Sequence, residues 1–384
     1  MFERTERGLL ARWWWTVDRP MLAGIGLLVL SGMVFVFASS PPVAARLGLP
    51  HLHFAGRHAL YLVPAAVLLL GSSLLSPVGV RRLAWALLGL SLLMLVLTLL
   101  VGPEIKGAQR WLPLGLVVLQ PGEFAKPALV VITAALLARA QGIGNALPAI
   151  LLGALVAVLL LAQPDVSMAL VVVALLGVQL FLAGLPWLLV IVLIGLGAVG
   201  LWQTYVIFPH VAERIDRFID PASGDHYQVG LAMKAIKSAA WFGSGPGEGT
   251  VKYALPDTHS DFVFAVVAEE FGLVACLALL GLFGFVLLRG LARTQRVGDR
   301  FALLAAAGLL AQFALQTFIN LGVNVSLLPA TGMTLPFISY GGSSLMANAL
   351  VVGLLLALSD KGVEPPLPPG VLPRWRRLGR RGAS

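Results

Sequence analysis

The run AWALLGLSLLMLVLTLLV (84–101) decides the fold class, because it contains no charged residue over its whole length. It lacks the alternation of apolar and polar residues that is typical of a half-buried strand. In lipid a segment must satisfy its own backbone hydrogen bonds, which an isolated helix does and an isolated strand does not. The run is therefore predicted to be a transmembrane helix.

The composition extends this interpretation to the whole chain. Of 384 residues, 58% are hydrophobic and 12% are charged, and the mean hydropathy is +0.91. A soluble domain carries roughly 25% charged residues. We predict an all-α polytopic membrane protein with about ten transmembrane helices, at 21–38, 58–75, 84–101, 124–140, 146–162, 166–184, 186–206, 262–289, 301–320 and 340–358.

The distribution of Lys and Arg predicts the orientation. If the N-terminus is cytoplasmic, 17 of the 27 cations lie on the cytoplasmic side, as the positive-inside rule requires. Both termini are then cytoplasmic: a segment at 1–20, a transmembrane domain at 21–359 and a basic tail at 360–384. We interpret the net charge of +9 as a consequence of the membrane topology and as a source of attraction to anionic lipid headgroups. It does not indicate nucleic-acid binding, because the charge is scattered over short loops.

Two extracytoplasmic connections are unusually long, 102–124 and 207–261, and long connections in compact proteins are commonly functional. The second joins helices 7 and 8. It contains HYQVGLAMKAIKSAAWF (226–242), which is predicted to be an amphipathic helix at the membrane interface and includes Lys237. GSGPGEG (243–249) follows, and its alternating glycines predict a flexible turn.

The stretch LPDTHSDFVFAVVAEE (255–270) places carboxylates at the mouth of a predicted span and inside it. Asp261 allows two interpretations. In the first, Thr258 or Ser260 caps the helix in a capping-box-like pattern, and Asp261 favours the helix dipole from the first turn. In the second, Asp261 beside His259 is a general base at the membrane surface.

Glu269 and Glu270 lie within the same predicted span. A charged side chain at the centre of a span costs about 2.5–3.5 kcal/mol on insertion scales, so each should face protein or a wet cavity. Neighbouring helical residues point about 100° apart. We therefore expect different partners for the two side chains, one in a structural pair and the other lining a cavity.

Several other polar residues near the outer face also allow two interpretations. Glu123 and Lys126 form either a local ion pair or part of a binding site, and Arg110 is either an interfacial anchor or a phosphate ligand. Asp165 is interpreted as a turn and cap residue. Ser343, in LPFISYGGSS (335–344), would cap the last helix, whose paired glycines allow backbone N–H groups to approach an anion.

Some classes of chemistry are excluded. The chain contains no H-E-x-x-H, G-x-S-x-G or Cys/His cluster, which leaves zinc proteases and serine hydrolases without support. The single cysteine, Cys276, rules out an intrachain disulfide and a cysteine-built metal site.

Five motifs in order resemble the SEDS family (shape, elongation, division and sporulation), and its cell-division branch more than its elongation branch. They are KGAQRW (106–111), QPGEFAKP (120–127), QPD (163–165), GSGPGEGTVKYALPDTHSDFVFAVVAEEFG (243–272) and LLPATGMTLPFISYGGSS (327–344). The chain departs from the family pattern at Ser260, where threonine is commoner, and at Gly122, where serine is usual. QPDVSMA also lacks the frequent Gly-Thr after its aspartate.

The resemblance implies a peptidoglycan glycosyltransferase of the inner membrane, active at the division septum. It would polymerise lipid II into β-1,4 glycan strands on the periplasmic side. Implied partners are lipid II, the nascent strand, a class B penicillin-binding protein transpeptidase and other divisome membrane proteins. A lipid II flippase and a non-catalytic scaffold for the transpeptidase are the alternatives.

The family motifs fall on particular residues of this chain. Asp261 corresponds to the essential aspartate and is expected to be the general base. The expected substrate-binding residues are Arg110, Glu123, Lys126, Lys237, Lys252, His259, Ser260 and Ser343, with the basic ones stabilising the leaving pyrophosphate. A divalent cation such as Mg²⁺ or Mn²⁺ could share that charge, although no ligand spacing demands one, and no other cofactor is implied.

Overall fold

The computed structural model describes residues 8–359, except for 106, 116, 141, 142, 185, 208–211, 213, 214 and 217–226. The chain divides into two units, one of Arg19–Ser359 and one of Met1–Asp18 with Asp360–Ser384. In the second unit the described part is the short helix α1 (Leu9–Thr16) with its flanking residues. The predicted basic tail at 360–384 lies outside the described residues.

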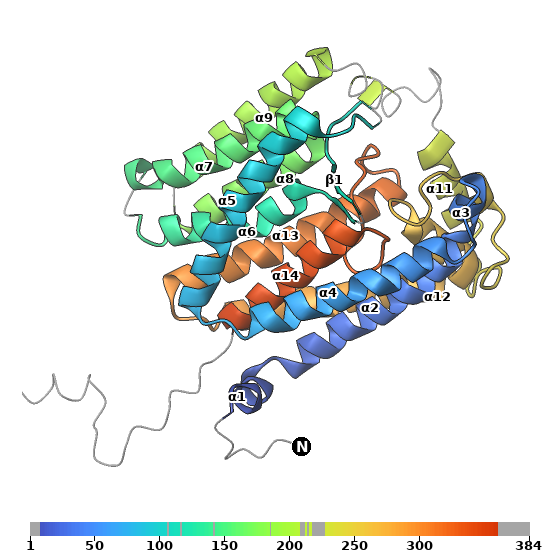
Figure 1. Ribbon diagram of the computed structural model, residues 1–384, viewed down its shortest axis with the longest axis horizontal. Coiled ribbons are helices and arrows are strands. Elements are labelled where there is room, and N and C mark those ends of the chain that lie inside the picture. The colour runs from blue at the N-terminus through green and yellow to red at the C-terminus, as the bar shows by residue number, and fades with distance from the viewer. Residues whose placement is uncertain are drawn as a thin grey trace, which may run out of the picture. The chain divides into compact units, whose positions relative to one another are not determined.

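The larger unit confirms the predicted all-α class, and a helix stands at each of the ten predicted spans (Figure 1). Seven of the described helices are long and apolar enough to cross a membrane, and α8 is a shorter apolar helix. The ten helices are α2 (Arg19–Ser39), α4 (His53–Ser73), α5 (Pro77–Val101), α6 (Pro121–Leu137), α7 (Ile143–Ala162), α8 (Val166–Leu182), α9 (Trp187–Ile207), α12 (Val263–Thr294), α13 (Arg300–Asn324) and α14 (Gly342–Ser359).

Three helices, α6, α13 and α14, form the centre of this unit, and their side chains are mostly buried. α14 packs against α4, α13 and α6. Its contact with α4 requires glycine at position 353, because a Cβ there would lie 2.0 Å from Ser72 Oγ. The opposite side of α4 exposes Leu60, Val63 and Val67, as expected of a surface that faces lipid.

Short elements occupy the connections at one end of the bundle. This is the end that the charge rule predicts to be outside, and it is called the outer end below. It carries α3 (Pro41–Arg46), an antiparallel hairpin of β1 (Leu112–Leu114) and β2 (Val117–Leu119), α11 (Tyr227–Lys237) and a 3-10 turn (Val251–Tyr253).

The long helix α12 is interrupted near its outer end. Gly272 has φ 78° and ψ −175°, outside the helical region. The helix bonds lost there are replaced from the segment before the glycine-rich run, since Leu273 N donates to Ala240 O (3.0 Å) and Val274 N to Trp241 O (3.1 Å). A Cβ at Gly272 would lie 2.3 Å from Gly243 N, so the approach of the two segments requires glycine.

The glycine-rich run folds around Glu269, which is buried. One carboxylate oxygen, Oε1, accepts from Thr250 N (2.6 Å) and Val251 N (2.7 Å), and the other accepts from Lys252 N (3.2 Å). Within the run predicted to be a flexible turn, 243–249, Ser244 N donates to Glu269 O (2.9 Å) and Gly245 N to Glu270 O (3.0 Å). The run and the residues after it are fixed on a carboxylate of α12.

Glu270 is also buried, on the same side of this loop. It accepts a hydrogen bond from Gly247 N (2.9 Å) and pairs with the ammonium of Lys252, which is buried as well. The prediction that one of the two glutamates lines a cavity is therefore wrong, because both hold the loop. We call Glu269, Glu270 and Lys252, with the loop 243–252, the clasp.

Helix α11 forms where an amphipathic helix was predicted, but protein covers its apolar side. Ala232 and Ala235 are buried in a cluster with Leu255, Phe262 and Val323. The helix therefore helps to fix the segment 255–262, which leads into α12, and it exposes Lys234 and Lys237 on its other side.

The predicted capping box before α12 does not form. The N-cap residue is Phe262, which makes no side-chain cap hydrogen bond. Thr258 donates instead to Ser39 O (2.9 Å) and Ser260 to Asp257 O (3.3 Å). A side chain of α13 accepts a hydrogen bond from the first turn of α12 instead, since Ala265 N donates to Asn324 Oδ1 (3.1 Å).

Candidate active site

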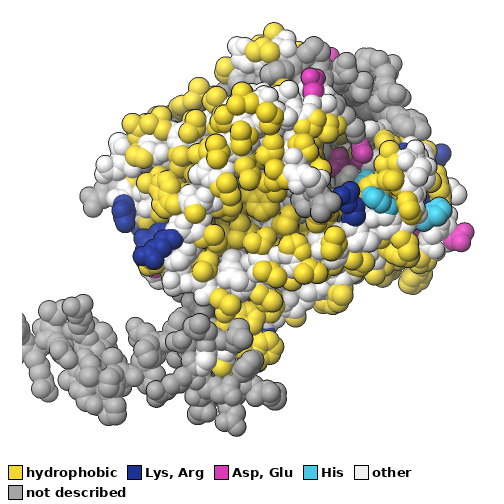
Figure 2. All heavy atoms as spheres, viewed as in Figure 1, with side chains coloured by type: hydrophobic (Ala, Val, Ile, Leu, Met, Phe, Trp, Pro, Cys, Tyr) yellow, Lys and Arg dark blue, Asp and Glu magenta, His cyan; other side chains and the backbone are white. Residues whose placement is uncertain are grey.

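A cavity of 730 Å³ opens at the outer end of the bundle. Segments from the whole chain form its wall: α4, the hairpin, α6, α11, residues 257–261 and residues 329–344. Figure 2 shows acidic side chains inside a hollow on this side of the molecule, with basic and histidine side chains at its edge. Six of the predicted site residues line the cavity: Arg110, Glu123, His259, Ser260, Asp261 and Ser343.

The cavity is shallow relative to a membrane. Among the described residues, those that line it from α4, α6, α11 and α14 lie within the first nine residues of their helix. Nine helical residues rise about 13 Å, whereas the hydrocarbon core of a bilayer is about 30 Å thick. The cavity is thus placed for chemistry at one surface.

Asp261 is held through its backbone. Its carbonyl oxygen accepts from two asparagines of α13, Asn320 Nδ2 (3.0 Å) and Asn324 Nδ2 (2.9 Å). Its N–H donates to the carbonyl of Asp257 (3.1 Å), a residue with φ 52° that also lines the cavity. These bonds fix the backbone of Asp261 and leave its carboxylate at the cavity wall.

His259 lies two residues before Asp261 and is 8% exposed. Its ring packs against Phe54 (4.5 Å between centroids) and Tyr340 (5.1 Å). Burial lowers the pKa of His259 from 6.5 to about 4, and the charge of Asp257 acts against this shift. The imidazole is therefore neutral at pH 7, and its Nδ1 has no hydrogen-bond partner among the described residues.

Glu123 and Lys126 form a close ion pair of 2.9 Å between Oε2 and Nζ. Glu123 lines the cavity, whereas Lys126 has no exposed surface and lies behind it. Both come from the first turns of α6, where the i, i+3 spacing brings them together. The pair presents its carboxylate to the cavity and its ammonium to the protein interior.

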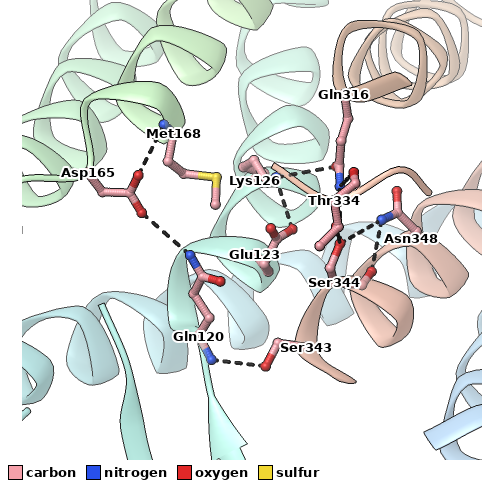
Figure 3. A network of polar contacts seen from close by, with 10 residues as sticks. All are labelled: Gln120, Glu123, Lys126, Asp165, Met168, Gln316, Thr334, Ser343, Ser344 and Asn348. Atoms are coloured by element: carbon pink, nitrogen blue, oxygen red, sulfur yellow. Dashed lines mark hydrogen bonds and ion pairs between the residues drawn. The ribbon is translucent and has the colours of Figure 1, made fainter. Parts of the chain in front are cut away.

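Gln316 of α13 extends this pair into a polar network (Figure 3). Its Oε1 accepts from Lys126 Nζ (3.5 Å), and its Nε2 donates to Ser344 Oγ (3.1 Å) and Thr334 O (3.3 Å). Asn348 Nδ2 donates to the carbonyl of Ser344 (2.9 Å). The network joins α6, α13 and α14 behind the cavity wall, to which Thr334 and Ser344 also contribute.

A second set of contacts fixes Arg110. Its NH2 donates to Pro164 O (2.8 Å), and its NH1 lies 3.7 Å from Asp165 Oδ1. Asp165 is the N-cap of α8 and accepts from Met168 N (3.4 Å), which confirms its predicted turn and cap role. Arg110 therefore faces the cavity with a guanidinium that is already oriented by the QPD segment.

Ser343 connects α14 to the segment before α6. Its Oγ accepts from Gln120 N (3.0 Å) and donates to Val118 O (3.4 Å), while Gln120 Nε2 also reaches Asp165 Oδ2 (3.5 Å; Figure 3). Ser343 is the second residue of α14 and makes its described bonds to this segment, not within its own helix. It is a contact between two walls of the cavity.

Lys237 and Lys252 do not line the cavity. Lys237 is exposed in the last turn of α11. Lys252 is held in the clasp by Glu270 and donates to Gly247 O (3.1 Å). Together with Lys126, which lies behind the wall, they are the predicted substrate-binding residues that do not line the cavity.

The cavity wall also contains residues that the sequence did not single out: Arg57, Tyr61, Asp257 and Tyr340. Arg57 ends the predicted first connection and Tyr61 lies in the predicted second span, where nothing local distinguishes them. Their spacing of four residues on one helix face is the signal that could have paired them. Among the described residues there is no group of three or more His, Cys, Asp or Glu side chains that could hold a metal ion. We therefore assign no step to a metal ion.

Comparisons with known proteins agree with this geometry. A family model described as "Cell cycle protein", covering FtsW, RodA and SpoVE, matches residues 19–363. A probable peptidoglycan glycosyltransferase FtsW of Caulobacter vibrioides is 42% identical over 365 residues, covering 94% of this chain and 93% of that protein. The corresponding protein of Allochromatium vinosum is 37% identical, with 89% of each chain covered.

Solved structures show the same fold. One, described as the structural coordination of polymerization and crosslinking by a peptidoglycan synthase complex, has a TM-score of 0.73 at 33% identity and covers 90% of this chain and 98% of that one. The rod shape determining protein RodA of Thermus thermophilus has a TM-score of 0.68 at 33% identity, with 90% and 97% covered. The resemblance to the SEDS family is confirmed: this chain belongs to the FtsW/RodA/SpoVE family of cell cycle proteins.

Proposed function

We propose that this protein is a peptidoglycan glycosyltransferase that polymerises lipid II into β-1,4 glycan strands during septal wall synthesis. The observation that carries the proposal is the position of Asp261, in the wall of a cavity that also contains Glu123 and Arg110. The relatives named as peptidoglycan glycosyltransferases, similar over about nine-tenths of the chain, support the same activity.

The reaction requires a base, because a sugar hydroxyl is a weak nucleophile. The 4-hydroxyl oxygen of the acceptor GlcNAc attacks the anomeric carbon of the donor, and its proton passes to the Asp261 carboxylate. The bond from that carbon to the undecaprenyl pyrophosphate breaks, with inversion, and the pyrophosphate leaves with the electron pair. A positioned general base contributes about 10²–10⁴-fold to such a step.

The charge on the leaving pyrophosphate calls for a cation fixed in advance. Arg110 meets this requirement, because Pro164 and Asp165 already orient its guanidinium at the cavity. Lys126 acts through Glu123, which it pairs at 2.9 Å, and is a positioning residue. His259, neutral at pH 7, supports the segment that carries Asp261.

The environment of the reaction follows from the predicted orientation. The cavity lies at the outer end, so both lipid-anchored substrates would reach it from the outer leaflet of the inner membrane. A crosslinking transpeptidase beside this chain would use the strand as it forms. The similarity to a chain from a peptidoglycan synthase complex that coordinates polymerization and crosslinking supports such a partner.

The test uses the purified full-length chain with its transpeptidase partner and labelled lipid II, with Mg²⁺ or Mn²⁺ present. Asp261→Asn should lower polymer formation by about 10²–10⁴-fold. Asp257→Asn is the matched control, because it removes the same charge from the same cavity wall at a residue with φ 52°, a conformation that asparagine tolerates. Its loss should be far smaller.

Four outcomes would change the proposal. Full polymer formation by Asp261→Asn would remove Asp261 as the base, and equal losses in both variants would show a charge effect of the cavity. Transport of lipid II across vesicles by the wild type without polymer would identify a flippase. If polymer formation by the complex depends only on the partner chain, this protein is a scaffold and not the polymerase.

A further inference from the structure

Five rings gather at the side of the cavity formed by α4 and the segment before α14. They are Phe54, His58 and Tyr61 of α4 with His259 and Tyr340, and we call them the aromatic wall. Tyr340 is its centre: the ring centroids of His259, Phe54, His58 and Tyr61 lie 5.1, 5.2, 6.3 and 6.5 Å from that of Tyr340.

The wall has a buried layer and a layer that faces the cavity. Phe54 and His58 are 9% and 0% exposed and do not line the cavity. Tyr61, His259 and Tyr340 line it, and the two tyrosines are half-buried. The tyrosine rings are thus backed by packed side chains and keep surface available on the cavity side.

Backbone contacts hold the aromatic wall next to the proposed reaction centre. Tyr340 N donates to the carbonyl of His259 (2.8 Å), two residues before Asp261. A Cβ at Gly342 would lie 2.8 Å from the ring of Tyr61, so glycine lets the start of α14 contact that ring. The wall is therefore coupled to residues 259–261 on one side and to α14 on the other.

Tyr340 and His259 are uncharged at neutral pH, and the wall has polar groups at its edge. Burial raises the pKa of Tyr340, whose side chain is hydrogen-bonded to Arg57, and burial lowers that of His259. The Tyr340 hydroxyl accepts from the Arg57 guanidinium and keeps its own proton available for donation. Flat apolar faces with hydroxyl tips suit ligands that are apolar on one face and polar at the rim.

A pyranose ring is such a ligand, because its C–H bonds form an apolar face and its hydroxyls form the edge. The electron-rich face of an aromatic ring attracts the positive edge of C–H bonds. We propose that Tyr61 and Tyr340 form a stacking platform for a pyranose ring of the lipid-linked saccharide, next to Asp261. This inference rests on the proposed function, since it assigns the saccharide subsite of the same cavity.

The test measures binding, so that it does not depend on turnover. The protein is the full chain in nanodiscs with Asp261→Asn in every sample, which prevents consumption of the ligand. Two probes are compared: a short-chain lipid II, and a prenyl pyrophosphate of the same chain length without a saccharide. The variants are Tyr61→Leu, Tyr340→Leu and Tyr340→Phe.

Tyr253→Leu is the matched control, because Tyr253 is an exposed tyrosine at the outer end that does not line the cavity. Both cavity leucine variants should weaken binding of short-chain lipid II by about three- to tenfold, the range of an aromatic contact. Their affinity for the prenyl pyrophosphate should not change. Tyr340→Phe keeps the ring and should bind more tightly than Tyr340→Leu, and Tyr253→Leu should match the parent.

Two results of this comparison would overturn the proposal. Unchanged binding of short-chain lipid II by Tyr61→Leu and Tyr340→Leu would show that the rings do not contact the ligand. Equal loss for both probes would assign the wall to the pyrophosphate or to folding. If Tyr340→Leu does not fold, Tyr61→Leu decides alone, because Tyr61 is half-buried at the edge of the wall.

This result is separate from the proposed function. If the wild type makes no polymer but binding of short-chain lipid II depends on the tyrosines, the saccharide subsite is upheld and the glycosyltransferase is rejected. If the wild type makes polymer but binding does not depend on the tyrosines, the glycosyltransferase is upheld and the saccharide subsite is rejected. Displacement of short-chain lipid II by phosphatidylglycerol vesicles, equally in all variants, would assign the cavity to bulk lipid headgroups and overturn the proposal.

Discussion

The buried ion pair of α6 makes an asymmetric prediction about stability. Lys126 has a fully buried side chain, whereas the Glu123 side chain is 8% exposed and lines the cavity. Glu123→Gln leaves an ammonium without its partner in the interior. Breaking a buried pair in this way costs about 3–5 kcal/mol of the free energy of unfolding.

Lys126→Met should cost less. The Glu123 side chain left behind is 8% exposed at the cavity, so water reaches part of it, although Oε2 itself is buried. The lost contact to Gln316 is long at 3.5 Å. The remaining cost is that of a partly unsatisfied polar group, about 1–3 kcal/mol. The double variant Glu123→Gln/Lys126→Met removes both charges and should be more stable than Glu123→Gln alone.

The assay is thermal unfolding of the three variants and the wild type in one detergent at pH 7, with polymer formation measured in parallel. The expected order of unfolding temperature is wild type, Lys126→Met, then Glu123→Gln, with the double variant above Glu123→Gln. An unfolding temperature of Lys126→Met at or below that of Glu123→Gln would refute the reasoning. So would a double variant whose loss equals the sum of the two single losses.

Two further predictions concern His259 and the clasp. The pKa of His259 falls from 6.5 to about 4 on folding, so between these pH values the unfolded chain binds a proton that the folded chain does not. The free energy of unfolding should therefore fall as pH drops through this window, by about 3 kcal/mol in total. Unfolding measured at pH 7 and pH 4.5 should show a smaller pH dependence for His259→Gln than for the wild type. An equal change in stability between the two pH values for both proteins would contradict the assignment. Gly243→Ala should destabilise far more than Gly247→Ala, because a Cβ at Gly243 meets Glu270 at 2.3 Å while one at Gly247 meets nothing within 4 Å. Both glycines have positive φ, so Gly247→Ala should show only the cost of placing alanine in that backbone conformation, about 1–2 kcal/mol. Equal losses of stability for Gly243→Ala and Gly247→Ala in thermal unfolding would argue against the clasp.

Much of the fold could be predicted from the sequence because lipid imposes one rule on every span. Continuous apolar runs such as 84–101 have one backbone solution in a bilayer, and each predicted range holds a helix. The cap at Asp165 could also be predicted, since its partner Met168 N is three residues away. Such features depend on local chemistry.

The features that could not be predicted depend on distant partners. Glu269 binds backbone N–H groups nearly twenty residues earlier, and the end of α12 is served by Asn324 of another helix. For the same reason the sequence alone places Lys252 among the predicted substrate-binding residues, although Glu270 holds it in the clasp. Arg57 and Tyr340 are brought to the cavity by helix packing, which no local pattern encodes.

The break at Gly272 changes how the length of α12 is read. As one straight helix, Val263–Thr294 would extend about 48 Å at about 1.5 Å per residue. The part after the break, residues 273–294, extends about 33 Å, close to the roughly 30 Å core of a bilayer. The half-helix before the break then lies beyond the bilayer core, at the outer end of the bundle. The two glutamates of the clasp would enter with the loop that holds them, so membrane insertion of α12 need not carry their charges through lipid.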